Sequence, residues 1–264
     1  MGIPEKTQRV SNTPQTVEKA LDIVEAFVHA EGSLGITELS NKLKMNKSTV
    51  YRILQVLLGR DYVHQDNKTN KYYLGYKILT IGGALLGQIQ LREVAKTHLE
   101  ELVAETAQTV RLAILDQEEV VYIDHVEGRD PISIRLQIGS RGPVYCTAAG
   151  KSILAFLEEK ERNNILARCT FEALTSKTII KVKNLKAHLR QIKNNGYSFC
   201  DEEYAKGVRA VGAPVFDREM KVIGSIVVVA PSFRMKHNEV RTFGKKVKET
   251  GLAISRKMGC PVTK

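Results

Sequence analysis

The chain has 264 residues, of which 43% are hydrophobic, with 19 glycines and only 7 prolines. This composition excludes a disordered chain and a collagen-like one, because there is enough apolar surface for a packed core. At roughly 100 to 200 residues per domain, the length favours two domains. The formal net charge of +11 predicts attraction to polyanions, with nucleic acid first, an anionic membrane surface second and acidic ligands third.

The four cysteines and the N-terminus indicate the compartment. The cysteines lie 23, 31 and 60 residues apart, which excludes the paired ligand spacing of a structural zinc site and argues against a disulfide framework. Residues 1–9 lack the apolar segment that a secretory signal peptide contains. The longest apolar stretch, residues 222–230, is far shorter than the roughly 20 residues of a membrane span. We expect a soluble, cytoplasmic protein with reduced thiols, no metal and no cofactor.

The first expected helix follows Pro14 and stops near Gly32. Its apolar residues recur every three or four positions, which is typical of one buried helix face. We expect that face to comprise Val17, Ala20, Leu21, Val24, Phe27 and Val28.

Two short helices are expected next. Thr37 can cap the first of them, because its hydroxyl can accept a hydrogen bond from the first turn, and Leu39 and Leu43 then face inward. Asn46 can cap the second, and the few residues between them complete a helix-turn-helix pattern. The inner stripe of this third helix is expected to be Val50, Ile53, Leu54 and Leu57.

The outer face of the third helix carries side chains that donate to phosphates and base edges. Five basic residues and no acidic residue lie between Leu39 and Arg60. The positive N-terminus of a helix favours phosphate, and arginine suits a bidentate contact with guanine. An ordinary solvated helix face is the structural alternative. With Thr37, the candidate DNA contacts are Lys47, Ser48, Thr49, Tyr51, Arg52 and Gln55.

A hairpin is expected directly after these helices. Residues 62–65 and 71–74 have strand composition, and the turn-forming residues 66–70 join them. A hairpin in this position is a wing, and Lys68 and Lys71 could place positive charge on the DNA backbone or in the minor groove.

Residues 35–79, GITELSNKLKMNKSTVYRILQVLLGRDYVHQDNKTNKYYLGYKIL, resemble the winged helix-turn-helix of the IclR family of bacterial transcriptional regulators. The resemblance continues through LREVAKTHLEELVAET, RLQIGSRGPVYCTAAGKSILAFL and NNGYSFCDEEYAKGVRAVGAPVFD, and it spans about residues 15–259. It implies an α+β chain with a dimer-forming DNA-binding domain and a GAF-like α/β domain for a small metabolite. We expect the winged helix-turn-helix at residues 1–75, a linker helix at 76–90 and the effector-binding domain at 91–264.

The linker and the second domain alternate helical and strand-like patterns. Residues 76–106 are helical in pattern, and Gly82, Gly83 and Gly87 predict a bend or close packing there. This segment is either a coupling element or a plain linker. Strands are expected at residues 110–115, 120–126, 132–138, 198–203, 208–216 and 222–230, and helices at 152–156, 158–167, 185–194 and 238–257.

Catalytic motifs are weak. Residues 149–152 imitate the end of a phosphate-binding loop, but Tyr145 stands where that loop needs glycine. The sequence contains neither HExxH nor GxSxG. Residues 201–203 are acidic, and we interpret them as a solvated strand end; Cys146 and Cys200 are interpreted as small buried hydrophobes. These observations favour a protein that is not an enzyme.

The resemblance also implies an effector site. In the family the effector lies against the loop corresponding to Thr147, Ala148, Ala149 and Gly150. The pocket wall carried over from the family is Ile134, Cys200, Val208, Ala210, Val227 and Val229.

The wall differs from that of glyoxylate-responsive members. Where they have an acid, a cysteine and two serines, this chain has Cys200, Ala210, Val227 and Val229. A small keto acid would lose about 1–3 kcal/mol per missing polar partner. We therefore expect a carboxylate effector with an aromatic or aliphatic part. Arg111 is a second anion anchor if it faces inward.

The leading hypothesis is a regulator that binds double-stranded, pseudo-palindromic operator DNA as a homodimer or tetramer and does not bind membranes. The alternatives are an enzyme with an ancillary nucleic-acid domain and a structural nucleic-acid-binding protein. The sequence leaves open the effector, the operator, activation or repression, and the role of the basic C-terminal segment.

Overall fold

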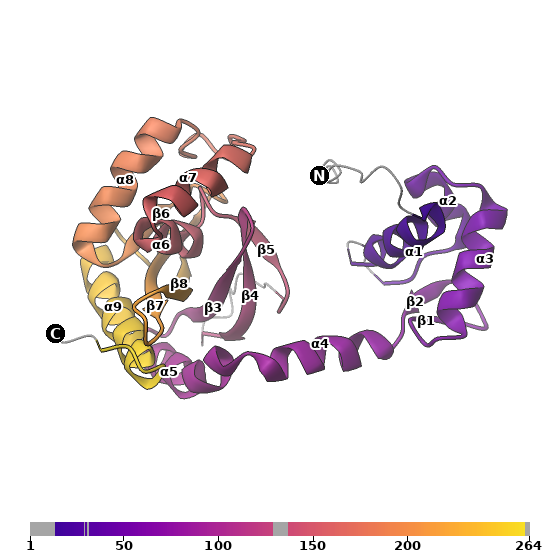
Figure 1. Ribbon diagram of the computed structural model, residues 1–264, viewed down its shortest axis with the longest axis horizontal. Helices are drawn as coiled ribbons and strands as arrows, with labels where there is room; N and C mark the ends of the chain where they lie inside the picture. The colour runs from indigo at the N-terminus through magenta and orange to yellow at the C-terminus, as the bar shows by residue number, and fades with distance from the viewer. Residues whose placement is uncertain (1–13, 29, 31, 129–136, 262–264) are drawn as a thin grey trace. The chain divides into compact units, whose positions relative to one another are not determined.

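The computed structural model describes residues 14–28, 30, 32–128 and 137–261. The chain divides into two compact units, Met1–Gln88 and Ile89–Lys264 (Figure 1). The expected class, a winged helix-turn-helix followed by an α/β domain, is confirmed. Ile134 and most of the strand expected at residues 132–138 lie outside the described residues.

The described part of the first unit begins with three helices and a hairpin and ends with helix α4, and the first three helices pack around one apolar core. Helix α2 contacts α3, and α1 contacts both. The bounds are α1 Gln15–Ala26, α2 Ile36–Leu43, α3 Lys47–Leu58, β1 Val63–Gln65 and β2 Tyr72–Leu74. The core includes Ile23, Phe27, Leu39, Val50, Ile53, Leu54, Val63 and Tyr72.

The buried face of α1 differs from the predicted one. Val17 and Leu21 are each 56% exposed, and Val28 is 66% exposed. Phe27 is buried as predicted, but the other buried residues of this segment are Ile23 and Ala26, which the predicted face did not include. Helix α1 carries two apolar stripes, and only one of them can pack against α2 and α3, so that periodicity alone could not identify the buried stripe.

The start of α2 also differs from the prediction. Gly35 is the N-cap, and Thr37 lies inside the first helical turn. The Glu38 carboxylate accepts a hydrogen bond from the Gly35 N–H at 2.6 Å. The side chain that caps the start of α2 is therefore this carboxylate and not the Thr37 hydroxyl. Asn46 occupies the predicted N-cap position of α3, but its side chain makes no capping hydrogen bond.

The hairpin is held by its turn and by the segment before α2. Strands β1 and β2 pair antiparallel, and the Asp66 carboxylate accepts from the backbone N–H groups of Lys68 and Thr69, each at 2.8 Å. Leu34 and Tyr72 exchange two backbone hydrogen bonds, which adds a third short segment that the sequence patterns did not indicate. Gly75 follows β2 directly. Only glycine fits at this position, because a Cβ there would lie 2.0 Å from the Asp61 carbonyl oxygen.

Helix α4 spans Lys77–Gln88 and is apolar, yet none of its residues is buried. It continues through Gly82 and Gly83, and among the described residues a Cβ at either position would meet nothing within 4 Å. The helix therefore has no break at Gly82 or Gly83, and the described residues of the first unit do not pack closely against either glycine. The helical pattern is interrupted at Ile89, whose backbone is not helical.

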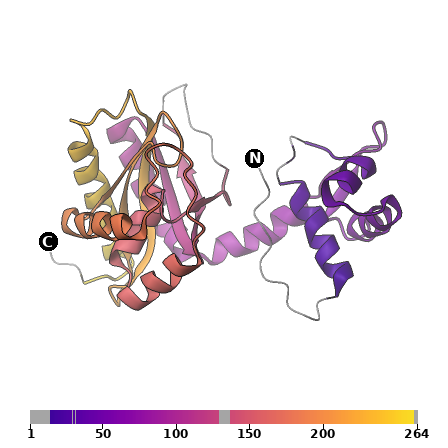
Figure 2. The same ribbon diagram turned by 90° about the horizontal axis from the view of Figure 1, so that it is seen from above.

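The second unit is an antiparallel sheet covered by helices on both faces. Its strand order is β5-β4-β3-β8-β7-β6. Helices α5 and α9 pack on one face, and α6 packs on the other with α8 beside it (Figures 1 and 2). The bounds are α5 Gln90–Thr106, β3 Thr109–Asp116, β4 Glu119–Val126, β5 Arg141–Pro143, α6 Ala148–Phe156, α7 Glu159–Arg168, α8 Val182–Asn195, β6 Ser198–Asp201, β7 Val208–Phe216, β8 Val222–Pro231 and α9 Val240–Lys257.

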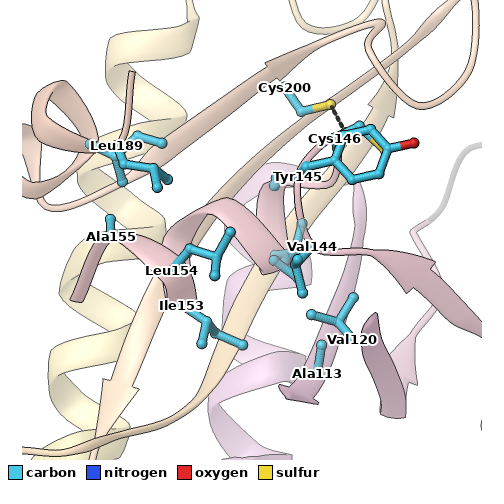
Figure 3. Packing of buried hydrophobic residues seen from close by; sticks show 14 of the residues in the cluster. Ala113, Val120, Val144, Tyr145, Cys146, Ile153, Leu154, Ala155, Leu189 and Cys200 are labelled. Atoms are coloured by element: carbon cyan, nitrogen blue, oxygen red, sulfur yellow. Dashed lines mark hydrogen bonds between the residues drawn. The ribbon is translucent and has the colours of Figure 1, made fainter. Parts of the chain in front are cut away.

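The larger core lies between the sheet and α6. Gly150 permits the close approach of this helix, because a Cβ there would lie 2.3 Å from the Val144 Cα. Figure 3 shows Val144 beside α6, with Ile153 and Leu154 directed into the same apolar cluster. In the described part of the chain no helix is long and apolar enough to cross a membrane.

Candidate functional site

The outer face of α3 is the first candidate site. Ser48, Arg52 and Gln55 are exposed together with Lys47 and Tyr51, while Thr49 is half-buried. The opposite face holds Val50, Ile53 and Leu54 in the core and Leu57 half-buried against it, as predicted. The helix therefore presents its polar residues as one continuous surface.

The electrostatics of the α3 N-terminus favour an anion. The first turn contains no acidic residue, and Lys47 stands at its first position. Within the described residues, no carboxylate forms an ion pair with Lys47 or Arg52. The unsatisfied N–H groups of a helix start and these side chains together form a site that suits a phosphate group.

The wing places its two predicted lysines differently. Lys68 is exposed in the turn. Lys71 forms an ion pair with Glu38 of α2 at 3.0 Å. The same Glu38 carboxylate accepts from Gly35, and both interactions lower the pKa of Glu38. Lys68 is thus available for contact with a backbone phosphate, whereas Lys71 also links the wing to α2.

The second candidate site lies on the α6 face of the sheet. Cys200 pairs with Ala210, and Ala210 pairs with Val229, so that these residues form one row across β6, β7 and β8. Arg111 pairs with Val227 in the adjacent row. Residues directly opposite each other in antiparallel strands share a face of the sheet, so the structure brings these predicted residues together. Val208 is half-buried against the same cluster.

Arg111 faces inward and is only 3% exposed. Its guanidinium carbon lies 5.6 Å from the centre of the Tyr122 ring, within the range of a cation–π interaction. Burial lowers the pKa of Arg111, and it raises the pKa of Tyr122 to about 12. The side chain remains cationic at neutral pH because an arginine pKa starts far above it.

The first turn of α6 is buried and tightly built. The Thr147 hydroxyl caps the helix by accepting from the Gly150 N–H at 3.1 Å, and it donates to the Pro143 carbonyl at 2.8 Å. The Ala148 carbonyl accepts from the Ser198 hydroxyl at 2.7 Å. Ala149 completes this turn and is fully buried. The predicted loop is therefore a capped helix start that packs on the sheet next to Ala210 and Val229.

Sequence patterns missed a buried ion pair beside this site. Lys151 is fully buried, and its ammonium group donates to the Glu203 carboxylate and, at 3.0 Å, to the Phe199 carbonyl. Burial raises the pKa of Glu203. This pairing accounts for the lysine of the phosphate-loop-like stretch, and it shows that residues 201–203 are not simply a solvated strand end. Asp201 is also paired, with Arg209 at 2.7 Å.

Sequence reasoning also missed Tyr122, although a signal for it existed. The two-residue turn between β3 and β4 sets the hairpin register, which places Tyr122 opposite Ala113, two residues from Arg111. The tyrosine is thus a diagonal neighbour of the arginine. No comparable local signal links Lys151 to Glu203.

The thiols of Cys146 and Cys200 lie in the buried core. All four cysteines are free, and Cys200 donates to the Cys146 carbonyl at 3.1 Å (Figure 3). Burial raises the pKa of the Cys146 thiol far above its ordinary value, which disfavours the nucleophilic thiolate. Among the described residues no group of three or more His, Cys, Asp or Glu side chains could hold a metal ion.

Comparisons with known proteins give matches to both units of the chain. A model described as bacterial transcriptional regulator IclR C-terminal matches residues 83–256, and a model of the IclR helix-turn-helix domain matches residues 16–67. The HTH-type transcriptional regulator XynR of Escherichia coli strain K12 is 36% identical over 94% of this chain and 98% of its own length.

Solved structures show the same architecture. The crystal structure of the Thermotoga maritima IclR has a TM-score of 0.79 at 31% identity, and the match covers 93% of this chain and 99% of that one. An IclR homolog from Microbacterium hydrocarbonoxydans complexed with 4-hydroxybenzoate has the same fold, with a TM-score of 0.79 at 19% identity and 92% and 98% coverage. The chain belongs to the IclR family: it is a transcriptional regulator and not an enzyme.

Proposed function

We propose that this regulator reads a pseudo-palindromic operator through α3 and responds to an organic acid bound beside Arg111. The DNA-binding role is assigned to residues 1–75, the connection to 76–90 and the effector-binding role to 91–264. Because such a protein acts on chromosomal DNA, its place is the cytoplasm.

The observation that carries the DNA-reading proposal is the acid-free polar face of α3. Lys47 and Ser48 lie at the positive end of the helix dipole, and Arg52 and Gln55 follow along the same side. This arrangement suits phosphate contact at the helix start and base contact farther along. Thr49 and Tyr51 flank this face on the same helix, and Lys68 extends the positive charge into the wing. Thr37, exposed on α2, is the remaining proposed contact.

The Arg52→Ala variant tests the DNA-reading proposal. Loss of a base or phosphate contact should weaken operator binding about 10-fold or more in a gel shift with the upstream fragment. The matched control is Arg218→Ala, which removes an exposed arginine from the second unit. If the Arg52→Ala variant binds the operator as tightly as the control does, the assignment of α3 as the reading helix is wrong.

For the effector, we propose a carboxylate with an aromatic or aliphatic part. A buried cation beside Tyr122 favours a carboxylate, and Val227, Val229 and Ala210 line the adjacent sheet face with apolar surface. A small hydrophilic acid would leave its remaining oxygens without polar partners on this wall. The structure of the Microbacterium protein, which is complexed with 4-hydroxybenzoate, supports the idea that this fold can hold an aromatic acid.

Titration calorimetry with benzoate and glyoxylate tests this preference. We expect the wild-type protein to bind benzoate more tightly than glyoxylate, and the Val229→Ser variant to reduce the difference because a hydroxyl restores a polar partner. Tighter glyoxylate binding by the wild type would refute the apolar effector class. An unchanged preference in the Val229→Ser variant would remove Val229 from the wall.

We also propose a homodimer, with a tetramer as the alternative assembly. Two apolar surfaces of the first unit have no partner within the described chain: the outer stripe of α1, with Val17 and Leu21, and α4, where Leu79 is 71% exposed and Leu85 62% exposed. Apolar surface of this kind on a DNA-binding unit suits a second copy, and a dimer matches an operator with two half-sites.

A further inference from the structure

A groove of about 340 Å³ lies on the second unit, and residues of α6, α7 and α8 line it. Its apolar lining is formed by Ala155 of α6 and Leu189 of α8, which are 1% and 2% exposed. Four cationic side chains line the same groove: Arg162 of α7 and, from α8, Lys186, Arg190 and Lys193. One carboxylate, that of Glu159, is also present.

The convergence of these cations follows from the helices. Lys186, Arg190 and Lys193 are spaced by four and three residues, which places them on one face of α8. Helix α8 contains no Asp or Glu that could neutralise them. Arg162 reaches the groove from α7, where one of its nitrogens donates to the Leu157 carbonyl at 3.4 Å, and its other donors are left for another group.

The described residues provide no carboxylate partner for the four cations. In the described part of the chain, none of them forms an ion pair, and this includes pairs with Glu159 across the groove. Like charges this close repel one another. Lys186 is half-buried over the apolar lining, where the lower dielectric strengthens any interaction with an anion. A bound anion would therefore relieve repulsion that the fold itself leaves in place.

We propose that this groove is a ligand site for a small polyvalent anion, a phosphate ester or a di- or tricarboxylate. The volume lies near the lower end of small-molecule pockets, roughly 300–1,000 Å³, which suits a metabolite better than a polymer. Four cations against one carboxylate require a ligand with more than one negative charge. The planar Arg162 and Arg190 guanidinium groups match carboxylate and phosphate oxygens.

This site is separate from the proposed effector site. Thr147 begins α6 in the effector site, and Ala155 near the other end of the same helix lines the groove. Eight residues of helix correspond to about 12 Å. An anion in the groove would join α7 and α8 and stabilise the packing of α8 against α6.

Titration calorimetry on the full chain at low ionic strength tests the proposal, with inorganic pyrophosphate and citrate as probes and acetate as the monovalent comparison. We expect saturable binding of at least one polyvalent probe at one site per chain, and at least 10-fold weaker binding in the double variant Arg190→Gln/Lys193→Gln. The matched control is Arg241→Gln/Lys245→Gln, which removes the same two charges from exposed positions of α9. The control should bind the probe as the wild type does.

Three outcomes would overturn the proposal. The first is an absence of saturable binding of both probes by the wild type. The second is equal weakening in the groove variant and the α9 control, which would indicate attraction to net charge rather than a site. The third is a groove variant that binds the probes normally but loses affinity for unrelated duplex DNA, which would make the groove a contact for the nucleic-acid backbone.

Discussion

Arg111 and Lys151 illustrate how much a residue's role depends on its surroundings. Both are cations of the second unit, and both are buried. Lys151 is neutralised by Glu203, whereas Arg111 lies over the Tyr122 ring beside the apolar wall. Removal of one member of a buried ion pair typically costs about 3–5 kcal/mol, so Lys151 is a structural residue of the α6 face. The proposed anion-binding role of Arg111 rests on its position beside Tyr122 and the apolar wall.

His188 makes the stability of the protein depend on pH. Burial and the nearby Lys151 charge lower the pKa of His188 from 6.5 to about 4. Between these two values the unfolded chain binds a proton that the folded chain does not, so stability is present above pH 6.5 and is lost as the pH falls towards 4. From pH 7 to pH 5 this effect should remove about 1–2 kcal/mol from the free energy of unfolding.

Urea unfolding of the wild type and the His188→Gln variant at pH 7 and pH 5 checks this prediction. The variant should lose less stability between the two pH values than the wild type does. An equal loss in both proteins would show that His188 does not titrate between folded and unfolded states as described.

At the scale of elements, glycine has different roles in α6 and α4. Gly150 in α6 lies against the backbone of Val144, and no side chain fits between them. Gly82 in α4 faces open space within the described chain. Helical periodicity identified both segments as helices, but the contact that makes Gly150 necessary comes from packing against a different segment.

Calorimetric unfolding of two alanine variants distinguishes the packing role of Gly150 from the open position of Gly82. Gly150→Ala should destabilise the second unit by about 3 kcal/mol or more, because the Cβ forces α6 away from the sheet. Gly82→Ala should stabilise α4 by about 0.5–1 kcal/mol, since alanine loses less backbone entropy in a helix. A stable Gly150→Ala variant would contradict the tight packing of α6, and a destabilised Gly82→Ala variant would indicate that a second copy packs closely against that glycine.

At the scale of the whole molecule, the apolar residues of α4 bear on assembly. The double variant Leu79→Asp/Leu85→Asp should shift the protein from dimer to monomer in analytical ultracentrifugation, because charge on a buried interface is costly. Met220→Asp is the matched control, since Met220 is 62% exposed on the second unit and lies outside α4. If the double variant remains as dimeric as the control, the dimer interface does not include α4.

The sequence by itself determined the winged helix-turn-helix, the polar face of α3, the wing turn and most strands and helices of the second unit. These features follow from periodicity and turn residues, which act between residues close in the chain. Even there, α1 carried two apolar stripes, and only packing decided that Ile23 rather than Leu21 is buried.

Only the tertiary structure decided the inward direction of Arg111, the pairing of Lys151 with Glu203, 52 residues away, and the meeting of Arg162 with Lys186 and Arg190 in one groove. Each of these depends on which faces of separate elements pack together, and burial then sets the charge environment. The sequence specifies which side chains are present. The distances between them and the dielectric around them are set only when the chain has folded.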